Sequence, residues 1–221
     1  MPRTLFERHL AEVQGEMLVM ADMVEKAIQR SVQALKGRDV GLARQVIADD
    51  LKINLKRYDI EERCLELIAT QQPLAGDLRT IIAVLHMIVD LERMGDHAEG
   101  IAKIAVMLAD EPPLKPYVDI PRMADAASRM LRESMEAFKK RDADQARAVM
   151  NEDDEVDALY DQVYRELLTY MLGDPRTIEQ ATRIIWVAHN LERIGDRVTN
   201  ICERAVYMVT GKMEELNVSK Y

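Results

Sequence analysis

The chain has 221 residues, of which 31% are charged and 48% hydrophobic, a composition typical of a soluble folded protein. Its formal net charge of −9 argues against general nucleic-acid binding, because contact with phosphates requires a surplus of Lys and Arg. Aromatic residues make up only 5% of the chain, while Met occurs 14 times. Flexible Met side chains fill gaps between helices, so this balance favours a helical bundle over a β-sandwich.

The sequence contains no recognisable targeting segment. The N-terminal residues lack the apolar stretch of a signal peptide, and the longest strongly apolar run, 81–89, is too short to span a bilayer. Cys64 and Cys202 lie far apart and form no C-x-x-C pair, so both are expected to be buried, reduced and structural. These features predict a soluble, cytoplasmic protein.

Apolar residues recur every three or four positions in the first half, which is the period of an α-helix. This spacing predicts helices over 5–35, 39–70 and 75–109. Gly37 is expected to cap the end of the first helix, and Asp39 to cap the start of the second. Short connections between long helices favour antiparallel packing in an up-down bundle.

Prolines mark the division of the chain into two halves. Four of the seven prolines lie in the stretch E-P-P-L-K-P-Y-V-D-I-P, so residues 111–122 are expected to form a stiff linker. The first half then spans 1–110 and the second 123–212, followed by a tail at 213–221. Within the second half, helices are expected over 123–140, 142–172 and 175–210.

The second half repeats the first. At an offset of 103 positions, nine residues between 24 and 50 are identical to their counterparts: Ser31, Ala34, Lys36, Arg38, Asp39, Ala43, Arg44, Val46 and Asp50. Further on the offset becomes 100, and L-E-R-M-G-D at 91–96 matches L-E-R-I-G-D at 191–196. The sequence therefore predicts an all-α fold of two tandem antiparallel three-helix bundles related by internal duplication.

The repeated phrase places two carboxylates on one helix face, because Glu92 and Asp96, like Glu192 and Asp196, are four residues apart. Like charges at this spacing cost roughly 0.2–0.5 kcal/mol, and a glycine inside a helix costs about 0.5–1 kcal/mol relative to Ala. The sequence nevertheless contains this carboxylate pair and glycine twice, at 91–96 and 191–196. A destabilising feature that occurs twice indicates a function.

The preceding helix of each half offers a second polar stripe. In the first half it consists of Asp50, Asn54 and Tyr58, and in the second of Asp153, Asp157 and Asp161. Oxygen ligands that converge without Cys suit cations such as Mg, Ca, Mn or Fe. The alternative is a solvated helix face that Arg93 and Arg193 neutralise, with Gly95 and Gly195 marking only close helix packing.

Enzyme signatures are missing from the sequence. No Glu has a His three residues after it, as di-iron bundle enzymes require, and no H-E-x-x-H, P-loop or G-x-S-x-G motif occurs. The four histidines, His9, His86, His97 and His189, are expected to be polar or packed residues rather than metal ligands. Trp186 is expected to make core or oligomer contacts.

The paired L-E-R-[MI]-G-D, the Q-Q-P-L-A-G-D-L-R before the first copy and the R-T-I before the second resemble the PhoU family of phosphate-uptake regulators. The resemblance covers about 5–211. It implies metal clusters bound by E(D)-x-x-x-D elements, with Fe, Zn, Mn or Mg as candidate ions. The ligands that it implies here are Glu92, Asp96, Glu192 and Asp196, with Asn54 and Asp157 added from the second-helix stripes.

The resemblance also implies a non-enzymatic function. The expected role is negative regulation of the phosphate-starvation response and modulation of phosphate uptake, by an adaptor that commonly forms homodimers. Its expected partners are the ATPase subunit of the phosphate ABC transporter and the sensor histidine kinase of the phosphate regulon. It would reach the membrane only through these proteins. The alternative is a metal-storage protein or a metal-dependent enzyme of the helical-bundle type.

Overall fold

The computed structural model describes residues 3–212, and this part of the chain forms helices without any strand. The expected tail at 213–221 lies outside the described residues. The helices are α1 (Arg3–Gly37), α2 (Val40–Gln71), α3 (Ala75–Leu108), α4 (Asp119–Lys140), α5 (Ala143–Met150), α6 (Asp153–Gly173) and α7 (Ile178–Thr210), with a 3₁₀ turn, η1 (Pro175–Thr177), before α7. The prediction of an all-α fold is confirmed.

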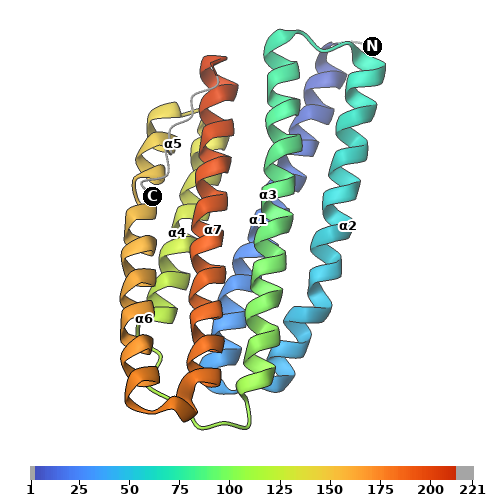
Figure 1. Cartoon of the computed structure of the whole chain (residues 1–221). Helices are drawn as coiled ribbons and strands as arrows, with labels where there is room; N and C mark the ends of the chain where they lie inside the picture. Colours follow the sequence, from blue (N-terminus) through green and yellow to red (C-terminus); the bar gives the residue numbers. More distant parts are fainter. Residues whose placement is uncertain (1–2, 213–221) are drawn as a thin grey trace.

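In the first half, α2 runs antiparallel to both α1 and α3, and the three helices pack pairwise along their lengths (Figure 1). The positions that set the helical period, such as Met17, Ile28 and Ile60, are fully buried. Cys64 and Cys202 are buried free thiols, as expected. The core of the bundle therefore forms where the apolar period of the sequence places it.

The turn after the first helix differs in detail from the prediction. Gly37 is the last helical residue, and Arg38 takes the left-handed conformation with a φ of 55°. The Asp39 backbone N–H reaches back to the Ala34 carbonyl at 2.9 Å, while the Asp39 side chain accepts from the Leu42 N–H at 2.9 Å. Arg141 repeats this turn with a φ of 54°, so the duplication includes an unusual backbone conformation.

The second half breaks the helix that was expected over 142–172. It ends as α5 at Met150 and begins again as α6 at Asp153, with the Glu152 N–H donating to the Val149 carbonyl at 3.0 Å. Four successive acids, residues 152–155, follow the break. Closely spaced like charges repel one another inside a helix, whereas carboxylates in a first turn face the positive end of the helix dipole and are favourable there. The acidic run therefore favours a new helix start.

The linker is shorter than expected, because α4 begins at Asp119 inside the predicted 111–122 segment. Pro121 fits the first turn of α4, where backbone N–H groups have no partner within the helix. The linker is also fixed to the second half. Lys115 is buried and forms an ion pair with Glu166, and the Gln180 side chain donates to the Pro112 carbonyl at 2.7 Å.

The two halves meet where α3 packs against α7 and α1 against α4 (Figure 1). At this seam Asp90 on α3 accepts hydrogen bonds from Arg197 and Asn200 on α7, each at 3.2 Å. Its counterpart Asn190 on α7 lies 2.9 Å from the ring nitrogen of His97 on α3. The polar contacts of the seam thus follow the same pseudo-twofold relation as the sequence.

None of the helices within residues 3–212 is both long enough and apolar enough to cross a bilayer.

Candidate carboxylate sites

The first candidate site lies between α2 and α3. Asp50 on α2 faces the repeated L-E-R-M-G-D segment of α3, residues 91–96. If Gly95 carried a Cβ atom, that atom would lie 3.3 Å from Asp50 Oδ1. Its Oδ2 atom accepts a hydrogen bond from the Asn54 side chain at 2.8 Å, while Oδ1 is buried without a hydrogen-bond donor. The packing of α2 against α3 therefore buries the Asp50 Oδ1 atom between the two helices.

Neighbouring acids act on Asp50. Burial, together with the negative charges of Glu99, Asp96 and Glu92, raises its pKa to about 6, against the lowering effect of the hydrogen bond from Asn54. The three α3 carboxylates are therefore close enough to Asp50 to interact with it electrostatically. The expected convergence of the α2 and α3 stripes in the first half is present.

The second candidate site lies between α6 and α7 and follows the same plan. Asp153 on α6 is buried against Gly195, where an added Cβ would lie only 2.6 Å from its Oδ1 atom. Burial raises the pKa of Glu192 to about 7, helped by the charges of Asp196 and Asp157 and opposed by Arg193. The second half thus also gathers carboxylates from two helices on one face.

The glycines of the repeated phrase have a packing role. A side chain on Gly95 would also approach Ile53 of α2 to 3.2 Å, so each glycine leaves room for the aspartate of the facing helix. The interpretation of Gly95 and Gly195 as points of close helix approach is confirmed. It is compatible with a site, because the same approach brings the α2 and α6 carboxylates to the α3 and α7 phrase.

The arginines of the phrase neutralise part of the charge. Arg93 donates to Asp96 at 3.0 Å and Arg193 to Asp196 at 2.9 Å, each within its own helix. Within residues 3–212, no three His, Cys, Asp or Glu side chains are gathered in the arrangement of metal ligands. The acids therefore share a face, and metal binding by three of them requires side chains to reorient.

The chemistry of the faces fits a hard cation. Asp50 Oδ1 and Glu192 Oε2 are buried acceptors without a hydrogen-bond donor, and burial, reinforced by neighbouring carboxylates, raises the pKa of both groups. A divalent or trivalent cation bound there would relieve both the repulsion and the missing hydrogen bonds.

Two residues were not among the predicted ligands although they lie closest to the glycines. Asp50 and Asp153 appeared in the sequence only as members of the helical stripes, and Asp50 also as one of the identical pairs. Their conservation between the two halves was the available signal. It did not show that they, rather than Asn54 and Asp157, face the glycines of the next helix.

The histidines are not gathered into a site. His97 bonds to Asn190 at the seam, while His189 Nδ1 lies 3.4 Å from Glu192 Oε2. Trp186 does not belong to the core, since 55% of its surface is exposed. Of the two roles expected for Trp186, core or oligomer contact, the core position is wrong, and the oligomer contact stays a prediction.

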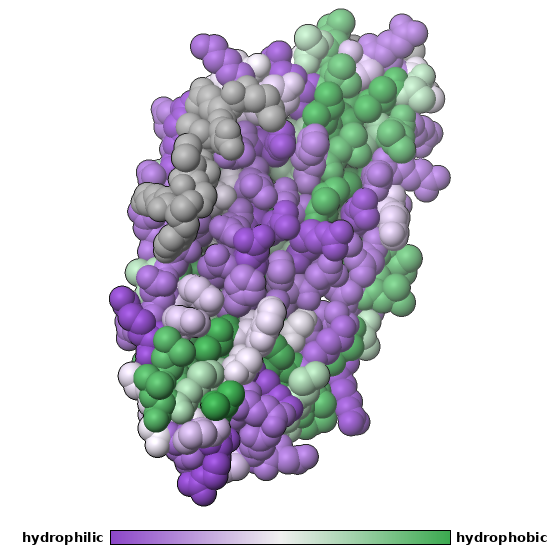
Figure 2. All heavy atoms as spheres, in the orientation of Figure 1, coloured by the Kyte–Doolittle hydropathy of each residue, from purple (hydrophilic) through white to green (hydrophobic). Residues whose placement is uncertain are grey.

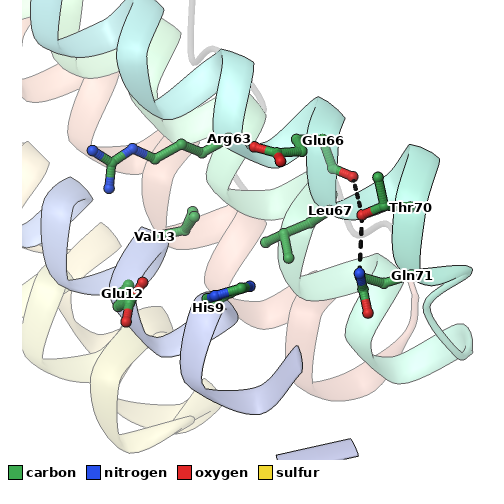
Figure 3. Close-up of a pocket in the computed structure, with 8 residues that line it drawn as sticks. All are labelled: His9, Glu12, Val13, Arg63, Glu66, Leu67, Thr70 and Gln71. Atoms are coloured by element: carbon green, nitrogen blue, oxygen red, sulfur yellow. Dashed lines mark hydrogen bonds between the residues drawn. The ribbon is translucent and has the colours of Figure 1, made fainter. Parts of the chain in front are cut away.

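A cavity of about 360 Å³ lies away from the carboxylate faces, between the start of α1 and the end of α2 (Figure 3). Its apolar part is formed by Val13 and Leu67. Two charged residues on its wall have nearby partners, because Arg63 pairs with Asp59 at 3.2 Å and Glu12 lies 3.6 Å from Arg8. The cavity shows no pairing of a nucleophile with a base that would indicate catalysis.

Comparison with known proteins assigns the family. A model of the PhoU domain matches the chain twice, over residues 17–105 and 120–205. The chain belongs to the PhoU family. The two matches correspond to the two halves of the duplication.

Several relatives support this assignment over almost the whole chain. A phosphate-specific transport system accessory protein PhoU homolog from Aquifex aeolicus is 44% identical over 206 residues, which cover 93% of each chain. The homolog from Clostridium acetobutylicum is 39% identical and is covered completely.

Solved structures show the same fold. The crystal structure of PhoU from Pseudomonas aeruginosa matches with a TM-score of 0.89 and 40% identity, covering 94% of this chain and all of that one. The phosphate transport system regulatory protein PhoU from Streptococcus pneumoniae matches with a TM-score of 0.88 and 30% identity, covering 95% and 99% of the two chains. The relatives are named accessory or regulatory proteins, so the prediction of a non-enzymatic protein is confirmed.

Proposed function

We propose that the protein is a negative regulator of the phosphate-starvation response that also modulates phosphate uptake. The observation that carries this proposal is the similarity over both halves to proteins named as accessory to phosphate-specific transport. In the proposed mechanism the protein is a cytoplasmic adaptor. It connects the ATPase subunit of the phosphate ABC transporter to the sensor histidine kinase of the phosphate regulon.

The adaptor role predicts physical association with both partners. A tagged copy of the full chain, purified from cells grown with ample phosphate, is expected to retain the ATPase subunit and the sensor kinase. The fraction of each that is retained is expected to change in phosphate-starved cells, because the adaptor transmits the state of the transporter. Quantitative mass spectrometry of the retained proteins measures this. Retention of neither protein in either condition contradicts the adaptor role.

We also propose that the two carboxylate sites bind metal ions. The predicted ligands are Glu92 and Asp96 with Asn54 in the first half, and Glu192 and Asp196 with Asp157 in the second. Asp50 and Asp153 are added because they face the same glycines. Bound Fe, Zn, Mn or Mg would supply positive charge that holds α2 to α3 and α6 to α7. The metal thereby fixes the acidic faces that partners meet.

Elemental analysis of the purified protein tests this proposal. The wild type is expected to carry metal after desalting. The double variant Glu92→Gln with Asp96→Asn is expected to lose the metal of the first half only. The corresponding variant at Glu192 and Asp196 is expected to lose that of the second half. Asp144→Asn is the control, since this side chain is 96% exposed on α5 and should leave the metal content unchanged. A wild type without metal, also after incubation with each of the four ions, contradicts metal binding.

The proposed oligomeric state is a homodimer. Exposed apolar side chains at Leu51, Leu55 and Tyr58 lie on one face of α2, at helical spacing, and support an association between copies. Sedimentation of a monomer at micromolar concentration would contradict it.

A further inference from the structure

The second half carries a group of aromatic side chains beside its carboxylate face. The aromatic cluster consists of Tyr160 and Tyr164 on α6 and Trp186 and His189 on α7. The Tyr160 ring lies 6.3 Å from the Tyr164 ring and 6.2 Å from the His189 ring, measured between centroids. The His189 ring in turn meets Trp186 edge-on at 5.8 Å. The four rings therefore form one continuous surface across two helices.

This surface is open to solvent. Trp186 is 55% exposed and Tyr164 is 41% exposed. Aromatic residues make up only 5% of the chain, so a group of them at the surface is unusual for this protein. Exposed apolar residues continue toward the end of α6 and the start of α7, with Leu172 85% exposed and Ile178 48% exposed. Figure 2 shows an apolar area at this end of the molecule. Exposed aromatic and apolar side chains that gather on one side of two neighbouring helices are typical of a site of protein association.

The first half shows that the fold does not require these rings. The counterparts of Tyr160 and Tyr164 at the offset of 103 are Arg57 and Glu61, which form an ion pair at 3.2 Å on the surface of α2. At the offset of 100, Trp186 corresponds to His86. Equivalent positions of the two bundles thus carry an ion pair in the first half and neighbouring aromatic rings in the second.

Acidic groups border the aromatic cluster. His189 Nδ1 lies 3.4 Å from Glu192 Oε2, and the charges of Glu192 and Asp161 help burial to raise the pKa of Tyr160. Rings beside carboxylates make a site that attracts a cation, through the ring face and through charge.

The basic residues of α7 nearest in sequence already have carboxylate partners. Arg193 pairs with Asp196 at 2.9 Å, and Arg183 pairs with Glu179 and lies 3.4 Å from Glu111. In the part of the chain that the structure describes, the cation–π contact is Arg57 over Tyr58, in the first half. Among the described residues, no Lys or Arg lies over the rings of the aromatic cluster, which leaves their exposed faces available to a cation from another molecule.

We propose that the aromatic cluster is a docking surface for an arginine-bearing segment of a partner protein. The guanidinium stacks on the exposed ring of Trp186 or Tyr164 and pairs with the exposed Asp161, whose charge acts on Tyr160. Arginine suits this surface better than lysine, because its planar group stacks on aromatic rings and bonds carboxylates in a fork. The apolar end formed by Leu172 and Ile178 contacts the flanking residues of the segment. This proposal rests on the proposed function, which requires partner proteins.

Variants that give the second half the residues of the first test the surface. Trp186→His and Tyr164→Glu are both exposed changes, and retention of the helical circular dichroism confirms that they fold. Each is expected to weaken binding of the purified ATPase subunit or kinase domain roughly tenfold or more, as for an aromatic residue central to an interface. The control is Val19→Ala on α1, an exposed apolar residue outside the proposed interfaces, which is expected to bind like the wild type.

The outcomes separate this proposal from the proposed function. If the wild type binds a partner and both variants bind it equally well, the docking surface is wrong while the adaptor role stands. If the wild type binds neither partner, the adaptor role fails, and a direct measurement of the surface decides the proposal on its own.

That measurement uses the only tryptophan of the chain. Protein labelled with 5-fluorotryptophan gives one fluorine NMR signal, which reports on Trp186 alone. Short alanine peptides carrying arginine are expected to shift the signal more than those carrying lysine, and those carrying glutamate are expected to leave it unchanged. An equal shift by the glutamate peptides overturns the proposal. So does a shift that only anionic phospholipid vesicles produce, which would indicate a membrane surface instead.

Discussion

At the scale of single residues, the candidate sites depend on a carboxylate that faces a glycine. Asp50 meets Gly95 and Asp153 meets Gly195, so the absence of a side chain on one helix makes room for a buried acid on the next. This arrangement places negative charges together where water is partly excluded, and it raises the pKa of Asp50 to about 6 and of Glu192 to about 7. The cost in stability is the feature that a bound cation would remove.

The raised pKa values predict a pH dependence of stability in metal-free protein. Both carboxyls bind a proton more tightly in the folded state than at their ordinary values of 3.8 and 4.5. Their contribution is therefore present below about pH 4 and is lost as the pH rises through 6 and 7. The variant Asp50→Asn with Glu192→Gln should be more stable than the wild type at pH 8 by about 1–2 kcal/mol, a value reduced for solvent screening of half-buried groups.

Urea unfolding of chelator-treated protein at pH 5 and pH 8 measures this effect. The difference between variant and wild type is expected to shrink at pH 5, where both groups are mostly protonated. Asp144→Asn serves as the exposed control. A variant that is less stable than the wild type at pH 8 would show that the charged forms are favoured in the fold.

At the scale of helices, the duplicated elements have kept their polar contacts at the seam but changed the residues that make them. Asp90 receives Arg197 and Asn200 from α7, whereas Asn190 meets His97 from α3. The counterpart of Asn200 is Gly100. A Cβ atom at Gly100 would lie 3.3 Å from Asn190 Oδ1, so the missing side chain leaves room for Asn190. The seam between the halves is thus held by one charged and one neutral version of the same contact.

The charged version predicts a difference between two substitutions of Asp90. Asp90→Ala leaves Arg197 and Asn200 without their acceptor in a mostly buried place, so it should lower the free energy of unfolding by about 2–3 kcal/mol. Asp90→Asn retains an acceptor, as Asn190 does, and should cost about 1 kcal/mol. Urea unfolding measures both, with the exposed Asp110→Ala as the control. Equal stability of Asp90→Ala and the wild type would show that the contact does not hold the seam.

At the scale of the whole molecule, repetition made the fold predictable from the sequence. The helical period gave the first three helices nearly to the residue, and the internal match then gave the plan of the second half. The sequence did not reveal two local features of the second half, a helix break and a helix start. The acidic run at 152–155 breaks a helix whose first-half counterpart is continuous, and Pro121 lies within a helix start because its missing N–H costs nothing there.

The candidate sites were only partly predictable for a similar reason. Spacing along one helix showed that Glu92 and Asp96 share a face. The residue of the neighbouring helix that meets them depends on how deeply the two helices approach. Glycine packing sets this approach, and it brings Asp50 and Asp153 against the glycines, next to the predicted Asn54 and Asp157 on the same helices. The exposure of Trp186 was hidden as well, because helical spacing alone does not distinguish a core position from an interface.

The central claim, repression of the phosphate-starvation response, is tested most directly in cells. Deletion of the gene is expected to raise the output of a phosphate-responsive promoter when phosphate is ample, and the wild-type gene supplied in trans is expected to restore repression. The same reporter distinguishes the variants at the carboxylate sites from the Asp144→Asn control. Reporter output that is unchanged by the deletion in ample phosphate would contradict the proposed function.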